Sequence, residues 1–349
     1  MLEKQKGVHT VNDIKVIGID LAKTVFQLHA ADEKERVVWR KRVSRKELLP
    51  LIAQLKPCII GIEACGGSNY WAREFIKLGH RVRQIAPQFV VPFRKNDKND
   101  RNDAEAICEA VNRPSMRFVP VKGLRHQDVQ CLHRIRTRLV SNRTAAGNEI
   151  RGLLLEYGIT VAVGLKNLRR ELPAIVEKQA NELSEEVRII FQRLYEELVS
   201  LDKEIDFYDE KIKVVFKSEP ICKKLSKVEG IGLLTATALF SSVSDPKAYK
   251  NGRQFSASLG LVPKQNSSGN RQRLLSITKR GDSYLRTLLI HGSRAYLRVV
   301  LSKKDKKSLW AAEKIKQRGF NRAAVAVAAK NARTVWALMK NNATYQVAV

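Results

Sequence analysis

Hydrophobic and β-branched residues form short runs in the first third of the chain, and each run has the length of a strand. Strands are predicted at 15–20, 24–30, 36–40, 58–63 and 81–85. Apolar residues at helical spacing predict helices at 44–55, with Ser44 as N-cap, at 68–78, and from about 102 onward. Three strands followed by alternating helices and strands predict a mixed sheet flanked by helices, in an RNase H-like order.

The pattern changes near Gln127. Residues 127–157 and 170–215 are long helical patterns with few breakers. The window Glu171–Pro220 contains 13 acidic against 7 basic residues. Heptad-like apolar spacing runs through it at Ile190, Leu194, Leu198, Leu201 and Ile205. We predict a coiled coil, either antiparallel or between subunits, and the alternative is a solvated helical spacer.

The C-terminal region is predicted to be mostly helical. Val228–Gly232 reads as the tight turn of a helix-hairpin-helix element, in which Gly230 and Gly232 would let backbone N–H groups face a phosphate. An ordinary helix–helix turn explains the same residues equally well. The predicted domains are 1–125 (metal-binding, RNase H-like), 126–218 (helical linker and coiled coil) and 219–349 (C-terminal domain, ending in alanine-rich helix).

The charge balance indicates a polyanionic partner. The chain of 349 residues has 64 Lys and Arg against 35 Asp and Glu, a net charge of +29. Residues 251–349 contain 20 Lys and Arg against 3 Asp and Glu, a net charge of +17. Because neutralised phosphates release counterions, such a chain is expected to bind nucleic acid. A basic protein without such a partner and a membrane-surface binder are the alternatives.

Cysteines and hydropathy exclude several other classes. The 5 cysteines are scattered without a CxxC pair, so neither a disulfide framework nor a zinc site is predicted. Residues 1–6 lack the apolar core of a signal peptide, and no apolar run approaches the ~18 residues of a membrane span. We expect a cytoplasmic protein with no membrane association.

Four carboxylates lie where a sheet of this kind would gather them. Asp20 ends the first predicted strand, Glu63 ends a later one, and Asp100 and Asp103 lie three apart at a helix start. Together they could hold two Mg²⁺ ions ~4 Å apart, an arrangement that polarises a phosphodiester. Singly, each acid has a structural explanation, such as a turn, an arginine partner or a helix N-terminal charge. Asp97 and Asp100 have the same spacing as Asp100 and Asp103, so that register stays open.

Small hydroxyl side chains lie in the basic C-terminal region, at Ser267 and Ser268 before Gly269. Because the surrounding basic residues attract polyanions, a serine there is expected to lie near a phosphate group. Its position therefore indicates phosphodiester chemistry or phosphate binding. The nearest histidine in sequence is His291, so no serine–histidine pair is predicted; activation by metal fits better. The residues expected to contact nucleic acid or the reacting phosphate are Arg271, Arg273, Lys279, Arg280 and Arg286.

An ordered set of motifs resembles one known family. The N-terminal motifs are Gly18–Asp20, Gly61–Glu63 and Lys98–Ala104. The C-terminal motifs are Val228–Gly232, Phe255, Gly260–Pro263, Ser267–Gly269, Thr278–Asp282 and Tyr284–Arg286. Over nearly its whole length the chain resembles the DEDD transposases of the IS one-ten family of insertion sequences, most closely the IS eleven-eleven subgroup, with a RuvC-like N-terminal domain.

The resemblance implies roles for particular residues. Asp20, Glu63, Asp100 and Asp103 would be ligands of a divalent metal, and Ser268 would be the nucleophile that joins DNA covalently, with Ser267 as its competitor. It also implies element-end and target DNA and a non-coding guide RNA as partners. The long acidic helical spacer between the acids and the serine predicts, separately, a homo-oligomer, dimeric or tetrameric, in which the two meet between protomers. A water-using nuclease or Holliday-junction resolvase and a non-catalytic nucleic-acid-binding protein are the rival functions. A site-specific invertase would share the transposase's chemistry.

Overall fold

The computed structural model describes residues 14–94, 100–179, 181–268, 271 and 273–346, without the side chains of Asp100 and Arg101. The predictions made for residues 1–6, Asp97 and Gly269 therefore lie outside the described residues. The chain divides into two compact units, Met1–Leu124 and Arg125–Val349. The long helices at 124–218 belong almost wholly to the second unit, together with the C-terminal elements.

The first unit contains a mixed six-stranded sheet with the order β3-β2-β1-β4-β5-β6. Its strands are β1 (Val16–Asp20), β2 (Val25–Ala31), β3 (Val37–Ser44), β4 (Ile59–Glu63), β5 (Arg81–Ile85) and β6 (Phe118–Val119). β1, β2 and β3 pair antiparallel, β4 runs parallel to both β1 and β5, and β6 is antiparallel to β5. The five predicted strands are present, and the sheet is consistent with an RNase H-like domain. The short strand β6 was not predicted.

Helices cover both faces of this sheet, and the strand alternation decides which residues meet them. α1 (Arg45–Ala53) and α2 (Ser68–Lys77) pack over one face, where Ile17 and Ile19 of β1 are buried. The other face of the sheet, where Val16 is buried, is covered by α3 (Pro87–Val90), the 3-10 turn η2 (Val91–Phe93) and α4 (Asp100–Asn112). Because side chains alternate along a strand, Asp20 points to the same face as Val16.

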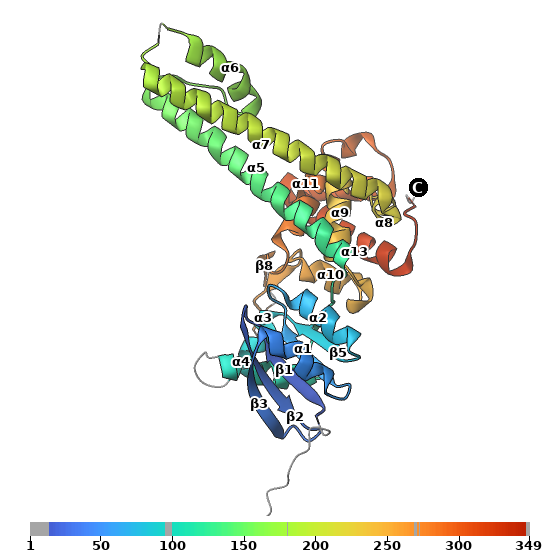
Figure 1. The fold of residues 1–349 in the computed structure, drawn as a ribbon. Coiled ribbons are helices and arrows are strands. Elements are labelled where there is room, and N and C mark those ends of the chain that lie inside the picture. The colour runs from blue at the N-terminus through green and yellow to red at the C-terminus, as the bar shows by residue number, and fades with distance from the viewer. Residues whose placement is uncertain (1–13, 95–99, 180, 269–270, 272, 347–349) are drawn as a thin grey trace, which may run out of the picture. The chain divides into compact units, whose positions relative to one another are not determined.

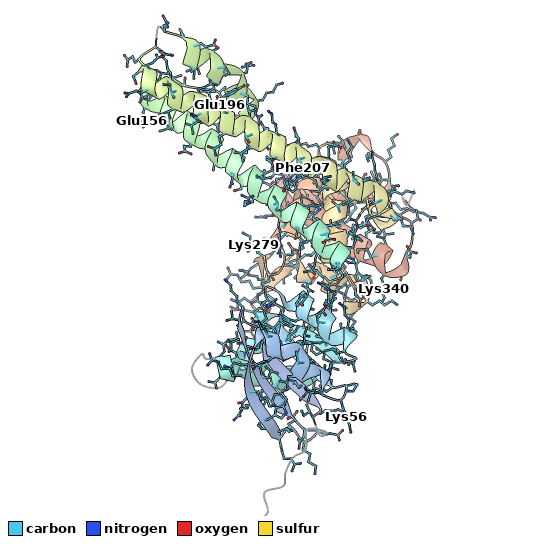
Figure 2. All side chains as sticks on the ribbon, viewed as in Figure 1. Lys56, Glu156, Glu196, Phe207, Lys279 and Lys340 are labelled. Atoms are coloured by element: carbon cyan, nitrogen blue, oxygen red, sulfur yellow. The ribbon has the colours of Figure 1, made fainter. Side chains whose placement is uncertain are left out.

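The second unit begins with a helical arm, in which α5 (Leu124–Glu156) and α7 (Glu185–Ser218) lie side by side and α6 (Leu165–Glu177) packs at the end remote from the C-terminal elements (Figure 1). Ion pairs join Arg136 to Asp209 and Arg143 to Asp202, so the two long helices run antiparallel. Phe207 on α7 is 52% exposed and visible on the arm's surface (Figure 2). The arm is an antiparallel hairpin within one chain.

Two details of the arm differ from the sequence prediction. The segment 170–215 is not one helix, because α6 ends at Glu177 and α7 starts anew after Ser184, whose hydroxyl accepts a hydrogen bond from the Val187 N–H. Ile190 does not belong to the buried seam, since it is 52% exposed. The buried positions at heptad spacing are Phe191, Leu198, Ile205 and Ile212.

The rest of the second unit is helical apart from one hairpin. The elements are α8 (Pro220–Leu225), α9 (Leu233–Ser242), η3 (Pro246–Ala248), α10 (Gly252–Ser258), β7 (Pro263–Gln265), β8 (Leu274–Ile277), α11 (Ser283–Leu297), η4 (Val300–Ser302), α12 (Lys306–Arg318) and α13 (Phe320–Asn341). The predicted helix–turn–helix is present as α8 and α9. The antiparallel β7–β8 hairpin was not predicted. Across the described residues, no helix is both long enough and apolar enough for a membrane span.

Candidate active site and nucleic-acid interface

Two of the four predicted acids lie together at the carboxyl edge of the sheet. β1 and β4 are parallel neighbours, and Ile19 lies opposite Ile62, so Asp20 and Glu63 end adjacent strands. By strand alternation both point to the face that α4 covers. The pKa of the nearby Cys65 thiol is raised, mostly by burial and to a smaller extent by the negative charges of Glu63 and Asp20. A pair of carboxylates is therefore present.

A pair of glycines lets α4 approach this edge closely. Gly18 and Gly61 are opposite each other on β1 and β4. A Cβ on Gly18 would lie 2.2 Å from the Ala104 carbonyl oxygen, and a Cβ on Gly61 would lie 3.0 Å from Cβ of Val111. The backbone of α4 thus packs directly on Gly18, and the α4 side chains Val111 and Ile107 pack on Gly61, in each strand two residues before the acid. This contact fixes the helix that contains Asp100 and Asp103.

We expect Gly18→Ala to lower the free energy of unfolding of the first unit by about 3 kcal/mol, because the new methyl group meets helix backbone that cannot rotate away. Gly66→Ala is the matched control, since a Cβ there has no atom within 4 Å. Its effect should stay within about 0.5 kcal/mol. Chemical denaturation of both variants measures the difference. Equal unfolding free energies for the two variants would contradict the close packing of α4 on Gly18.

The other two predicted acids, Asp100 and Asp103, belong to α4. Asp103 is 8% exposed and accepts a hydrogen bond of 2.5 Å from Nε of Arg94, with which it forms an ion pair. Asp100 starts α4, but its side chain lies outside the described residues. Among the side chains that are described, no group of three or more His, Cys, Asp or Glu is arranged to hold a metal ion. Arg94 contacts Oδ1 of Asp103, so a metal ion at that oxygen would displace the arginine.

The two candidate serines lie in the loop of the β7–β8 hairpin and have different surroundings. Both are exposed. The Ser267 hydroxyl accepts a hydrogen bond of 3.0 Å from Nε2 of Gln265. Ser268 pairs through its backbone with Arg271, whose N–H donates to the Ser268 carbonyl at 3.2 Å. Its hydroxyl makes no hydrogen bond to any other residue that the structure describes.

The predicted basic residues near the hairpin divide into two groups. Arg271, Arg273, Lys279 and Arg280 are exposed. Arg286 is partly buried, and its Nη1 donates to the carbonyl of Leu259 at 3.1 Å and to that of Arg280 at 3.3 Å. Arg286 thus fixes the loop that presents the other basic side chains. Its contact with nucleic acid stays a prediction.

The loop Thr278–Asp282 is held firmly against the end of α10. The Lys279 N–H donates to the Gly260 carbonyl at 3.2 Å, and a Cβ on Gly281 (φ +81°) would lie 1.8 Å from the Ser258 carbonyl oxygen. Asp282 then caps α11, because its carboxylate accepts from the Leu285 N–H at 3.0 Å. The charged groups of this loop are therefore presented from a rigid backbone.

The two glycines of the turn between α8 and α9 have separate roles. Gly230 has φ +85°, and a Cβ there would lie 3.0 Å from the carbonyl oxygen of Gly292 on α11. Asn331, fully buried, donates to the neighbouring Glu229 carbonyl at 2.9 Å. Gly232 is exposed, and a Cβ on it would meet nothing within 4 Å. Gly230 packs the turn, whereas Gly232 is the glycine with room for a ligand.

We predict that Gly230→Ala destabilises the protein by about 1–3 kcal/mol, because it combines a left-handed backbone with a tight contact to α11. Gly232→Ala should leave the unfolding free energy within about 0.5 kcal/mol of wild type. Thermal unfolding of the two variants in parallel measures this. An equally large loss in Gly232→Ala would show that the second glycine also has a packing role.

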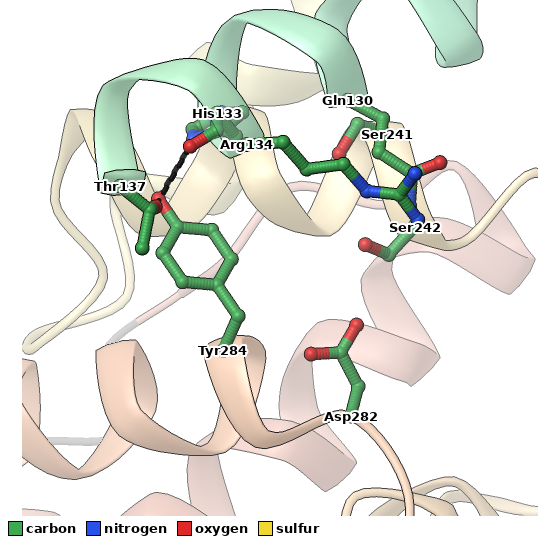
Figure 3. A pocket seen from close by; sticks show the side chains of 8 residues that line it. All are labelled: Gln130, His133, Arg134, Thr137, Ser241, Ser242, Asp282 and Tyr284. Carbon is green, nitrogen blue, oxygen red and sulfur yellow. Dashed lines mark hydrogen bonds between the residues drawn. The ribbon is translucent and has the colours of Figure 1, made fainter. Parts of the chain in front are cut away.

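A buried histidine joins the arm to the elements around the basic loop. His133 of α5 is 2% exposed, and its Nδ1 lies 2.9 Å from the Tyr284 hydroxyl of α11 (Figure 3). Its Nε2 lies 3.0 Å from Oγ1 of Thr237 on α9. Burial chiefly, with help from the nearby charge of Arg136, lowers its pKa to about 4, so it is neutral near pH 7. Sequence reasoning missed this link, because a lone histidine in a helix gives no sign of its partners.

Comparison with known proteins gives matches along almost the whole chain. Residues 17–159 match the DEDD transposase family of IS110, and residues 222–308 match the family described as Transposase IS116/IS110/IS902. The chain is 48% identical over 342 residues to the transposase for insertion sequence element IS1111A of Coxiella burnetii, covering 98% of this chain and 94% of the relative. It is 46% identical to a probable family 20 transposase of Pseudomonas aeruginosa, covering 95% and 98% respectively. A third relative is the IS1328 transposase of Yersinia enterocolitica, at 37% identity over 93% of this chain and 96% of the relative.

Proposed function

Because this chain belongs to the IS116/IS110/IS902 family of transposases and is a DNA transposase, we propose that it cuts and rejoins DNA through a covalent serine–DNA ester. The proposal depends above all on one observation. Asp20 and Glu63 end adjacent parallel strands on the same face of the sheet. Paired carboxylates in that place, in a chain with a net charge of +29, suit a phosphodiester as substrate.

The acids fit a divalent metal such as Mg²⁺, which prefers hard carboxylate oxygens. Asp20 and Glu63 would hold it, joined by Asp100 and by Asp103, whose Oδ1 also pairs with Arg94. When bound, the metal supplies Lewis-acid polarisation of the phosphodiester and stabilises charge on its oxygens. The contribution of the chain is to fix the two strand ends and to set α4 close to them through Gly18 and Gly61.

Ser268 is the proposed nucleophile. Its exposed hydroxyl lies on the hairpin beside Arg271 and Arg273, and the rigid loop with Lys279 and Arg280 belongs to the same unit. Attack of Oγ on phosphorus forms a phosphoserine ester and releases a 3′-hydroxyl. The basic side chains offset the extra negative charge of the pentacoordinate phosphate. Attack by a hydroxyl from another strand reverses the step and reseals DNA, since the ester preserves the bond energy.

The acids belong to the first unit and the serine to the second. We propose that complete sites form in a homo-oligomer, with acids and serine from different protomers, and that the arm at 126–218 is the assembly element between domains 1–125 and 219–349. Cleavage would then wait for assembly on the DNA. Cutting and joining by a stable monomer, measured by light scattering during the reaction, would contradict this assembly.

A guide RNA is proposed as a further partner, together with element-end and target DNA. The basic charge of the C-terminal region gives such a strand an electrostatic reason to bind, and Arg286 and the Gly232 turn are among the residues proposed to contact nucleic acid. RNase treatment of the purified protein before DNA binding tests this part separately. Loss of site-specific binding is expected, with non-specific binding retained.

A covalent-trapping experiment tests the proposed chemistry. Full-length protein with its co-purifying RNA is incubated with end-labelled duplex that spans the junction of the element and its flank, with Mg²⁺ or with EDTA. We expect a labelled protein–DNA band on a denaturing gel with Mg²⁺ and none with EDTA. Cleavage without that band would indicate a water-using nuclease or resolvase. Metal-independent binding without cleavage would indicate a non-catalytic nucleic-acid-binding protein.

A further inference from the structure

A pocket of about 310 Å³ lies in the first unit, at the edge of the sheet where the strands that carry the paired acids end. Its walls come from the loops after β1 and β4 and from the first turns of α1 and α2. The side chains and backbone used below are those of Lys23, Arg45, Gly66, Gly67, Tyr70 and Trp71. The two loops begin directly after Asp20 and Glu63, so the pocket and the acids share one edge of the sheet.

Two cations define the chemistry of the pocket. Arg45 lies with its guanidinium carbon 4.9 Å from the ring centroid of Trp71, and its Nη1 donates to the Lys23 carbonyl at 3.4 Å. Trp71 is 3% exposed and packs edge-on against Phe26, so it is a fixed platform. No acidic residue lines the pocket, and neither Lys23 nor Arg45 forms an ion pair with any acid that the structure describes. A planar guanidinium held in this way suits a phosphate.

The rim of the pocket suits a polynucleotide backbone. A Cβ on Gly66 or Gly67 would meet no atom within 4 Å, so this side of the pocket is low and open. Tyr70 is 42% exposed, and its ring packs edge-on against Trp71 with the two ring centroids 5.2 Å apart. An exposed aromatic ring beside two cations can pack against a sugar or base while the cations bind the phosphate.

We propose that this pocket binds a phosphate flanking the scissile phosphodiester of the DNA strand held at Asp20 and Glu63. Lys23 and Arg45 contact that phosphate, and Tyr70 packs against the adjoining nucleoside. This inference rests on the proposed function of the acids. Two carboxylates repel a polyanion, and cations placed at one side of them offset the repulsion at a neighbouring phosphate. The strand is thereby held in one direction across the acids.

Ethylation interference tests the pocket without requiring cleavage. Full-length protein with its co-purifying RNA, in Ca²⁺, is mixed with junction-spanning duplex in which phosphates have been ethylated at random. Bound and free DNA are separated, and the positions where a neutral phosphate prevents binding are read. We expect Arg45→Ala and Lys23→Ala to weaken binding of unmodified DNA about tenfold. Both variants should also lose the interference signal at one and the same phosphate, within a few nucleotides of the element–flank junction.

Lys46→Ala is the matched control, because Lys46 is an exposed cation on the same helix that does not line the pocket. It should keep the wild-type affinity and every interference signal. Tyr70→Ala should weaken binding severalfold, whereas Tyr70→Phe retains it. An interference pattern in Arg45→Ala identical to that of wild type would overturn the proposal. The loss of a signal remote from the element–flank junction would also overturn it.

The outcome is separable from that of the covalent-trapping experiment. If no protein–DNA adduct forms but Arg45→Ala still loses one interference signal, the serine chemistry is wrong and the pocket stands. If the adduct forms and the interference pattern is unchanged, the transposase chemistry stands and the pocket is wrong. Circular dichroism of each variant confirms that a lost signal reflects the pocket rather than unfolding.

Discussion

Ser268→Ala should abolish the protein–DNA adduct while leaving DNA binding within about twofold of wild type. The hydroxyl is the atom that would form the ester, and its removal leaves no oxygen to attack. The substitution should not disturb the fold, because Ser268 is exposed and its contact with Arg271 is through the backbone. Trapping on a denaturing gel and a binding titration in Ca²⁺ measure the two effects.

Ser267→Ala is the matched control for this prediction. Its hydroxyl accepts a hydrogen bond from Gln265, so it has a structural role within the hairpin. We expect the adduct to persist in this variant and to form at most severalfold more slowly. If Ser267→Ala loses the adduct and Ser268→Ala keeps it, the neighbouring serine is the nucleophile. If both keep cutting without an adduct, water is the nucleophile.

Much of the first unit follows from local sequence patterns. Its five main strands are short runs that contain apolar and β-branched residues, and the helices between them have apolar faces, so the pattern and the burial agree. The family resemblance drawn from short motifs is confirmed by identity along nearly the whole chain. The repeated pattern of glycine, isoleucine and acid at Gly18–Asp20 and Gly61–Glu63 marked both acids. That the two acids lie side by side is seen only from the pairing register of β1 and β4 in the structure. The structure also shows that α4 packs against the two glycines.

Other features had no adequate local signal. The strands β7 and β8 span three and four residues among basic and polar neighbours, too few for a periodicity to appear. Ile189, Ile190 and Phe191 are consecutive apolar residues, so the heptad frame could be started at any of them. Tertiary packing selects Phe191. The partner of Asp103 could not be predicted, because Arg94 is one of many arginines and nothing in the local sequence singles it out.

Asp20→Asn should lower cleavage and adduct formation by about 10³-fold. The amide nearly matches the carboxylate in shape, so the fold is retained, but it is a much weaker ligand for a hard cation. The chain also offers a readout independent of activity. Glu63 and Asp20 both raise the pKa of the Cys65 thiol, after the larger effect of burial. Asp20→Asn should therefore lower that pKa and speed alkylation of Cys65 at neutral pH.

The same thiol reports metal binding at the acid pair. In wild type, Mg²⁺ would offset the carboxylate charges, lower the Cys65 pKa and speed its alkylation, followed by mass spectrometry of its peptide. In Asp20→Asn the alkylation should already be faster without metal and respond little to Mg²⁺. Glu33→Gln is the control, because that exposed acid lies after β2 rather than at the acid pair. A variant that loses the Mg²⁺ response together with cleavage places the metal at Asp20. Retention of both would remove Asp20 from the site, whatever the role of Ser268.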